Sequence, residues 1–181
     1  MAVISPKLTY EDLLETPDDG KRYEIIDGEL LVSASPFPPH QRASWNFSGY
    51  FMHAERAGLG IGFSAPIDVA FDRFNVVVPD VVFITNERAN IITEVNIQGA
   101  PDILVEVLSP STRRRDLGVK MQLYARFGVP FYYIVDAKAQ TVQPYELVEG
   151  VYRPERLLTT EDELTCPLLP GISMPVSDLF L

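Results

Sequence analysis

VVVPDVVFI, residues 76–84, and ILVEVL, residues 103–108, are two apolar stretches that carry one carboxylate each, Asp80 and Glu106. We interpret both as strands with two apolar faces, because side chains alternate from one face of a strand to the other. The two carboxylates therefore point into dry surroundings. An unpaired charge there costs several kcal/mol, which is a large share of the stability of a domain. A divalent metal ion held by both carboxylates is the simplest compensation.

Each carboxylate also has an ordinary explanation. Pro79 cannot donate a hydrogen bond to a strand ladder and favours sheet edges, so Asp80 could be a strand-end acid near the surface. Glu106 has apolar neighbours on both sides, which leaves a structural salt bridge as its alternative role. Metal ligation is preferred because both acids fit one pattern.

The patterns around this pair predict alternating helices and strands. Thr9 and Asp12 have the spacing of a capping box, and Asp27-Gly28 suits the tight turn of a β-hairpin. Residues 58–62 follow a helix and lack the lysine of a phosphate loop, so we interpret them as a turn. The expected helices are residues 9–14, 40–57, 112–127 and one turn within 175–181; the expected strands are residues 23–26, 29–32, 67–71, 81–84, 102–108, 131–136 and 141–145, with a short hairpin around Gly150. This mixture indicates an α/β core with a mixed sheet, in two or three layers.

Length and composition indicate one ordinary globular domain. The 181 residues suffice for one well-packed domain, so residues 1–181 are expected to form a single unit. A composition of 46% hydrophobic and 22% charged residues excludes a disordered chain. The lone Cys166 and an N-terminus without a basic start and a long apolar core predict a cytoplasmic location. No apolar run approaches the roughly 20 residues of a membrane-spanning helix.

Several motifs resemble those of a known family. A Pro-Asp dipeptide on one strand and a glutamate on a later strand are similar to the active-site pattern of the PD-(D/E)XK nuclease superfamily. Within it, the chain resembles the Uma2 family of putative restriction endonucleases, nearly from end to end. The motifs are YEIIDGE at residues 23–29, His40, PDVVFI at 79–84, VEVLSPST at 105–112, Asp116, Lys120, Tyr124, GVP at 128–130 and IVD at 134–136.

The resemblance implies a restriction-endonuclease-like fold, with a mixed central sheet flanked by helices and an N-terminal β-hairpin. It also implies Mg²⁺- or Mn²⁺-dependent hydrolysis of phosphodiester bonds, with DNA as the expected partner. Asp80, Glu106 and the Val107 carbonyl would hold the ion. Lys120 would be catalytic, and Glu24 would be a further acid near the metal.

Leu108 stands where the superfamily usually has its lysine, and the following helix supplies Lys120 instead. Leu117, Tyr124 and Phe127 are expected on the same apolar face of this helix, so the Lys120 ammonium is expected to point toward the sheet. Asp116 precedes Lys120 by four residues. Asp116 could form an exposed ion pair with Lys120 that stabilises the helix by about 0.3 kcal/mol. Alternatively, it could orient Lys120 for catalysis.

The run of Arg113, Arg114 and Arg115 is the candidate for nucleic-acid binding. Cations in the first turn of a helix oppose its dipole, so the run indicates either a phosphate partner or a solvated basic turn. The net charge of −10 disfavours DNA binding unless the basic groups gather on one face.

Glu24 and His40 give weaker signals. Glu24 alternates with apolar residues in a hairpin strand, so without the resemblance its side chain is expected to be exposed. His40 follows three prolines at a helix start. It could contact a metal-bound water, but capping or packing of the helix is the preferred interpretation.

Two other functions also fit the sequence. A binding module that keeps the nuclease fold without turnover would explain the charge of −10 and Leu108, and a small-molecule phosphoesterase would explain the acidity. Calorimetric titration with Mg²⁺ or Mn²⁺ would distinguish an enzyme, which binds the ion, from a binding module, which does not.

Double-strand cleavage needs two active sites, so we also expect a two-fold homodimer. Tyr132, Tyr133 and the strand near Leu30 could belong either to its interface or to the core.

Overall fold

The computed structural model describes residues 6–181 of the chain. Residues 1–5, on which part of the expectation of a cytoplasmic location depends, lie outside the described residues. Among residues 6–181, no helix combines the length and the apolar character that crossing a membrane requires.

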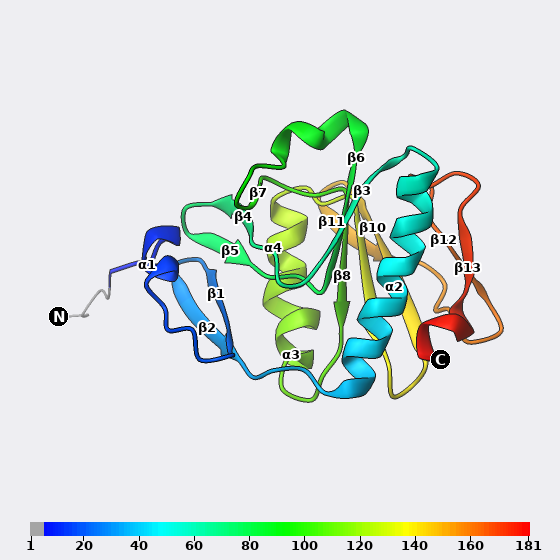
Figure 1. Ribbon diagram of the computed structural model, residues 1–181, viewed down its shortest axis with the longest axis horizontal. Helices are drawn as coiled ribbons and strands as arrows, with labels where there is room; N and C mark the ends of the chain where they lie inside the picture. The colour runs from blue at the N-terminus through cyan, green and yellow to red at the C-terminus, as the bar shows by residue number, and fades with distance from the viewer. Residues whose placement is uncertain (1–5) are drawn as a thin grey trace.

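A six-stranded sheet forms the centre of the molecule (Figure 1). Its strand order is β11-β10-β9-β8-β6-β3. Strands β8 and β9 run parallel and the other neighbours pair antiparallel, so the sheet is mixed as expected. The strands are β3 (Gly60–Ser64), β6 (Val81–Thr85), β8 (Ile103–Val107), β9 (Phe131–Asp136), β10 (Thr141–Val148) and β11 (Val151–Pro154).

One face of the central sheet is covered by the long helix α2 (Pro38–Arg56), which crosses the front of the sheet in Figure 1. Phe47 and Phe51 of this helix lie in one hydrophobic cluster with Phe83 and Tyr133 of the sheet. The C-terminal part of the chain extends this layer. It consists of β12 (Glu163–Thr165), β13 (Ser173–Pro175) and the 3₁₀ helix η3 (Val176–Phe180).

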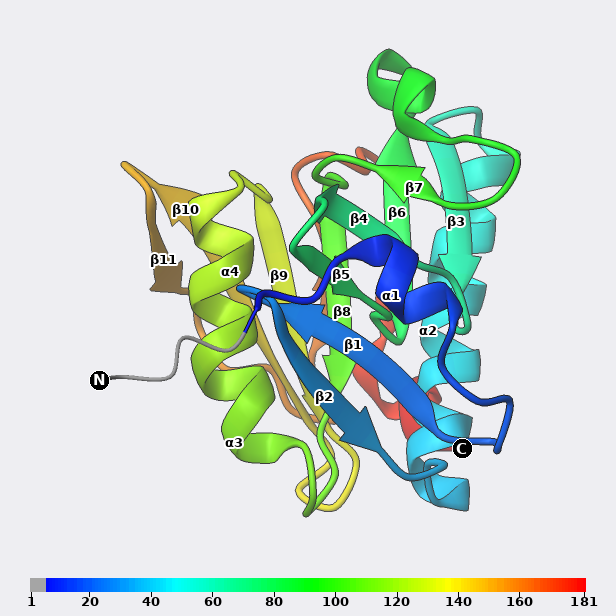
Figure 2. The same ribbon diagram turned by 90° about the vertical axis from the view of Figure 1, so that its left-hand side faces the viewer.

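The opposite face is covered by a helical layer and a second, smaller sheet (Figure 2). The helical layer is α3 (Arg113–Arg115), the π-helical turn η2 (Asp116–Lys120) and α4 (Met121–Arg126). The small sheet has the order β2-β1-β5-β4-β7, and its strands are β1 (Arg22–Ile26), β2 (Glu29–Ser33), β4 (Val69–Asp72), β5 (Asn75–Val77) and β7 (Ile97–Gln98). Helix α1 (Tyr10–Leu14) packs on this sheet, and the 3₁₀ helix η1 (Asn86–Ile91) follows β6. The central sheet is therefore the middle of three layers.

The N-terminal hairpin was predicted correctly. Strands β1 and β2 pair antiparallel around Asp27 and Gly28, whose φ angles are 54° and 82°. Positive φ at both central residues is the requirement of a type I′ turn, which explains the Asp-Gly sequence. The capping interaction before α1 also forms, because the backbone N–H and the hydroxyl of Thr9 both donate to Asp12.

Two expectations about the fold were wrong. Residues 60–62 belong to strand β3 rather than to a turn, and Gly60 is required there because a Cβ would collide with the Ile84 carbonyl. The stretch at residues 76–84 is not one strand, since β5 ends at Val77 in the small sheet and β6 begins at Val81 in the central sheet. Of the two alternatives left open for Tyr132 and Tyr133, interface or core, the structure supports the core, because both side chains are buried.

Candidate active site

Asp80 and Glu106 lie opposite each other where two central strands meet. Strands β6 and β8 pair antiparallel with Val81 opposite Val105, so one step further Asp80 faces Glu106. Both residues are 2% exposed. The backbone N–H of Val107 donates to Asp80 Oδ2 at 2.8 Å. The N–H and C=O of one strand residue point to the same edge of the strand, so the Val107 carbonyl lies on the Asp80 side too.

Asp80 is paired with two further side chains. Arg22 Nη1 lies 2.8 Å from Oδ1, and His40 Nε2 lies 3.1 Å from Oδ2. Burial raises the pKa of Asp80, but His40 and Arg22 more than offset this and lower it to about 2. Asp80 is therefore an ionised, fully paired acid, and the alternative of a strand-end acid near the surface was wrong.

Glu106 has a different environment from Asp80. Its Oε1 accepts hydrogen bonds from Lys120 Nζ at 2.8 Å and from the Tyr124 hydroxyl at 2.7 Å. Burial, helped by the nearby carboxylates of Asp116 and Asp80, raises the pKa of Glu106 to about 8 despite the Lys120 charge. Among the described residues, none donates a hydrogen bond to Oε2 of Glu106. One carboxylate oxygen is thus open to a ligand.

Lys120 is buried between three acids, as expected, but Leu117, which was expected on the same apolar face, is 38% exposed. Its ammonium lies 2.7 Å from Glu24 Oε1, 2.8 Å from Glu106 Oε1 and 4.0 Å from Asp116 Oδ1. Burial opposes its charge, yet the three carboxylates raise the pKa of Lys120 above its usual value. The π-helical turn η2 directs both Asp116 and Lys120 inward, and such turns are frequent at functional sites.

Glu24 is fully buried, which corrects the expectation of an exposed strand residue. Its Oε1 accepts the Val78 backbone N–H at 2.9 Å in addition to Lys120, and Arg115 lies 3.5 Å from Oε2. Burial raises the pKa of Glu24, but Lys120 and Arg115 outweigh it and lower the pKa below its usual value. Both faces of β1 are covered, so alternation along this strand does not separate a wet face from a dry one.

His40 does not cap helix α2. Phe37 holds the N-cap position, and the imidazole of His40 contacts Asp80 instead. Its other nitrogen, Nδ1, is buried without a hydrogen-bond partner among the described residues. The histidine thus lies beside Asp80. Of the preferred interpretation, capping or packing, the capping part was wrong, while His40 is indeed buried at the start of the helix.

The three consecutive arginines have three different environments. Arg113 pairs with Asp136 at 2.7 Å, and Arg115 points inward to Ser33 and Glu24. Arg114 is exposed. One of the three is thus part of the buried cluster, and the other two lie at the surface beside it.

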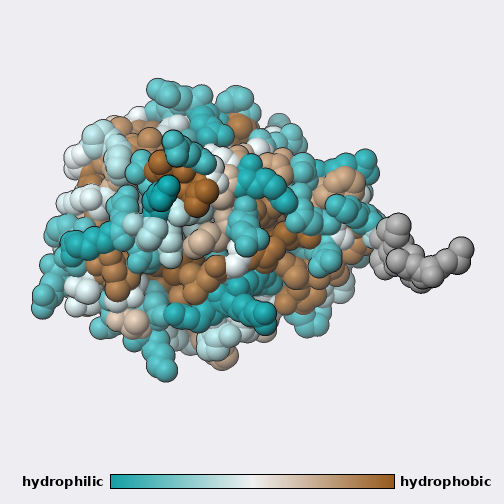
Figure 3. Space-filling model, turned by 180° about the vertical axis from the view of Figure 1, so that it is seen from behind, coloured by the Kyte–Doolittle hydropathy of each residue, from teal (hydrophilic) through white to brown (hydrophobic). Residues whose placement is uncertain are grey.

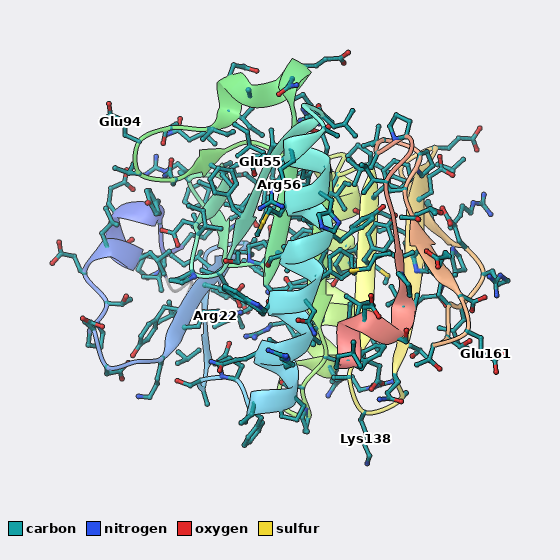
Figure 4. All side chains as sticks on the ribbon, turned by 45° about the vertical axis from the view of Figure 1, so that its right-hand side comes forward. Arg22, Glu55, Arg56, Glu94, Lys138 and Glu161 are labelled. Carbon is teal, nitrogen blue, oxygen red and sulfur yellow. The ribbon has the colours of Figure 1, made fainter. Side chains whose placement is uncertain are left out.

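Arg22 was not identified from the sequence, and Tyr124 was placed on the helix face of Lys120 without its contact to Glu106 being foreseen. Arg22 extends from β1 to Asp80 and is labelled in Figure 4, between the hairpin and α2. Tyr124 donates its hydroxyl to Glu106. The signal that could have identified Arg22 is its position two residues before Glu24, which puts both side chains on one face of β1.

The charge of the cluster is not balanced by its own side chains. Four buried acids face three permanent cations, and the members are Asp80, Glu106, Glu24 and Asp116 against Arg22, Arg115 and Lys120. With His40 left out of this count, one negative charge remains, and either a proton on Glu106 or an added cation would compensate it.

The donor atoms around Asp80 and Glu106 fit a hard divalent ion. Two carboxylates and a backbone carbonyl are oxygen ligands of the kind that Mg²⁺ and Mn²⁺ prefer. In residues 6–181 no group of three or more histidine, cysteine or acidic side chains is arranged to bind a metal, so the ion would need the Val107 carbonyl and water. Arg22 would also have to leave Asp80.

A hollow of about 610 Å³ opens on Asp80. Arg22 and Asp80 line it together with the first turns of α2, which include His40, and with residues 64–66. Asp80 can therefore be reached from solvent, although it is nearly buried itself.

Comparison with known proteins gives a family and a fold. The sequence model of the family described as Uma2, putative restriction endonuclease, matches residues 10–177. The fold is similar to the crystal structure of a putative nuclease belonging to DUF820 from Anabaena variabilis ATCC 29413, with a TM-score of 0.78. The two chains are 18% identical, and the match covers 96% of this chain and 97% of the other. This similarity confirms the expected fold. No curated protein sequence matches the chain.

Proposed function

Because the chain belongs to the Uma2 family of putative restriction endonucleases, we propose that it is a divalent-metal-dependent nuclease that hydrolyses phosphodiester bonds in DNA. The observation that carries the proposal is the pair of buried carboxylates, Asp80 and Glu106, opposite each other with a charged lysine 2.8 Å from Glu106. A stable core gains nothing from two facing acids, whereas a metal site needs them.

In this proposal Asp80, Glu106 Oε2 and the Val107 carbonyl hold Mg²⁺ or Mn²⁺. The ion supplies a Lewis acid for the scissile phosphate and lowers the pKa of nearby water. The chain supplies the fixed geometry, because both carboxylates are anchored on paired strands of the central sheet. A water molecule that attacks phosphorus in line with the leaving oxygen would form a new P–O bond as the old one breaks, and the leaving oxygen would take up a proton from solvent.

Lys120 supplies the positive charge beside the reacting phosphate. Its ammonium is held by Glu24 on one side and Glu106 on the other, and Asp116 lies 4.0 Å away. A preorganised cation of this kind stabilises the negative charge that develops in the transition state. We therefore assign Glu24 and Asp116 as positioning residues, which act through Lys120.

Arg22 competes with the metal ion for Asp80. The guanidinium contacts Asp80 Oδ1, the oxygen that a metal ligand would offer. Two cations cannot share one carboxylate oxygen without repulsion, so metal binding would release Arg22 into the adjoining hollow. There a guanidinium can bind a phosphate oxygen of the substrate.

The arginine run would contribute electrostatic attraction at the edge of the site. Arg114 is exposed and Arg113 shares its charge with Asp136, so their contribution to phosphate binding would be modest. The charge of −10 is distributed over the whole chain, and a local basic surface can still attract DNA.

Incubation with plasmid DNA tests the proposal. The wild-type chain is expected to nick or linearise supercoiled plasmid with Mg²⁺ or Mn²⁺ and to leave it intact in EDTA. Asp80→Asn removes the negative charge of one ligand and should reduce cleavage below detection, while Asp178→Asn, at a surface acid, should leave it unchanged.

A binding module without turnover is the second candidate, because Arg22 and His40 occupy both oxygens of Asp80 and Leu108 holds the usual lysine position. Plasmid that stays intact with either metal ion, while the wild-type chain still retards DNA in a gel, would support this candidate. It would contradict the nuclease.

We also propose that two copies pair through the edge strand β2. Leu30 and Val32 on this strand are exposed, and β2 has no neighbour on its outer side among the described strands. Figure 3 shows hydrophobic surface in separate patches on the rear face of the molecule. Light scattering at micromolar concentration should give the mass of a dimer. The mass of a monomer, with and without DNA and Mg²⁺, would exclude this pairing.

A further inference from the structure

Two hollows adjoin beside Asp80 and form one groove. The first, of about 610 Å³, includes Arg42 and Trp45 of α2, and the second, of about 370 Å³, includes Phe37. Arg22, Pro36 and His40 line both. The groove therefore opens on Asp80, one of the candidate metal ligands, with Trp45 in the first hollow and Phe37 in the second.

The lining of this groove favours a polyanion. Arg22 and Arg42 contribute two positive charges and Asp80 one negative charge, so the first hollow carries +1 in a chain of −10. Arg42 uses only its Nε in a hydrogen bond, to the Leu181 carbonyl, among the described residues. Its remaining N–H groups can bind phosphate. The lining of the second hollow includes the hydroxyl residues Ser109, Ser111 and Thr112 and has no acid among the described residues.

Trp45 and Phe37 are exposed to 69% and 64%. A single exposed aromatic residue is common on protein surfaces. Here, however, both rings border a basic groove that leads to Asp80. Aromatic rings in a basic groove are the arrangement on which the bases of single-stranded nucleic acids stack.

The two hollows are too small to hold a base-paired duplex inside the groove. Hollows of about 300–1,000 Å³ match ligands of the size of a nucleotide or two. In a duplex the bases are stacked and paired inside, so a base must be unpaired before it can reach a side chain in such a site.

We propose that this groove binds single-stranded DNA, with an unpaired base stacked on Trp45 and the neighbouring phosphates on Arg42 and on the N–H groups of Arg22 other than Nη1, which stays with Asp80 in the absence of metal. The assignment of DNA as the nucleic acid depends on the proposed nuclease function, whereas binding of a single strand in the groove does not. It predicts that the substrate is a single strand, a strand end or a distorted duplex in preference to intact duplex.

The intrinsic fluorescence of the chain tests this directly, because Trp45 is its single tryptophan. A short single-stranded oligonucleotide, titrated in EDTA so that no cleavage occurs, should quench the fluorescence to saturation. The same strand annealed to its complement should quench weakly and bind less tightly. Equal or tighter binding of the duplex would overturn the proposal.

Substitution of Trp45 measures the contribution of stacking. Anisotropy of a fluorescein-labelled single strand should show that Trp45→Ala weakens binding by about 5- to 150-fold, whereas Trp45→Phe keeps most of the affinity. Met52→Ala is the matched control, since Met52 is exposed on α2 but does not line the groove. Wild-type affinity in Trp45→Ala would overturn the proposal, and thermal melting would show that the exposed substitution leaves the fold intact.

The outcomes for the groove and for the hydrolytic site are separable. Binding is measured without metal, so quenching by a single strand with no cleavage of any DNA would retain the groove and reject the nuclease. Metal-dependent cleavage with no quenching would retain the nuclease and reject the groove.

Discussion

Lys120→Met is expected to reduce metal-dependent DNA cleavage by about 10²–10³-fold and to lower the free energy of unfolding by about 3 kcal/mol. Methionine keeps the length of the side chain but removes the charge that pairs with Glu24 and Glu106 at 2.7 and 2.8 Å. Two buried carboxylates then lose their shared cation. Single-turnover cleavage and urea denaturation measure the two effects.

Lys138→Met is the matched control for this variant. Lys138 is exposed at the end of the hairpin between β9 and β10 and is labelled at the edge of Figure 4. Its replacement should change neither cleavage nor stability beyond a few tenths of a kcal/mol. If Lys120→Met behaved like this control, Lys120 would have neither a catalytic nor a structural role.

Glu106→Gln is expected to make the metal-free protein more stable at pH 8 and to leave its stability at pH 4.5 nearly unchanged. The pKa of Glu106 is about 8 in the folded chain against 4.5 in the unfolded chain, so the wild type loses stability as the pH rises between these values. Glutamine does not titrate and avoids this loss. The expected difference at pH 8 is about 2–4 kcal/mol, measured by denaturation in EDTA.

Lys120 keeps Glu24 as its partner after the substitution of Glu106, so no buried cation is left unpaired. Glu161→Gln, at an exposed acid, serves as the control and should give the pH profile of the wild type. A Glu106→Gln protein that is less stable than the wild type at every pH would mark Glu106 as the partner in a structural ion pair.

The parts of the fold that depend on local sequence were predictable. The Asp27-Gly28 turn and the helix that ends before Gly58 follow from backbone preferences at single positions. The division of residues 76–84 between two sheets was not predictable. Valines before and after Pro79 are buried alike, so their pattern does not tell which sheet each half joins.

The candidate site was predictable only where a charged residue lies in an otherwise apolar segment of the sequence. Asp80 and Glu106 are acids in apolar strands, and Lys120 is a cation on an apolar helix face, so each was identified from its own segment. Arg22 lies in an ordinary hairpin and meets Asp80 across 58 residues of sequence. Such a partner follows from the packing of the small sheet against the central one, which the local pattern does not encode.

Calorimetric titration with Mn²⁺ in the absence of DNA tests the central claim most directly, which is that Asp80 and Glu106 together bind a divalent ion. The account predicts saturable binding by the wild-type chain and its loss in both Asp80→Asn and Glu106→Gln, with the folds intact by circular dichroism. No binding heat from the wild type, or equal affinity in all three proteins, would contradict it.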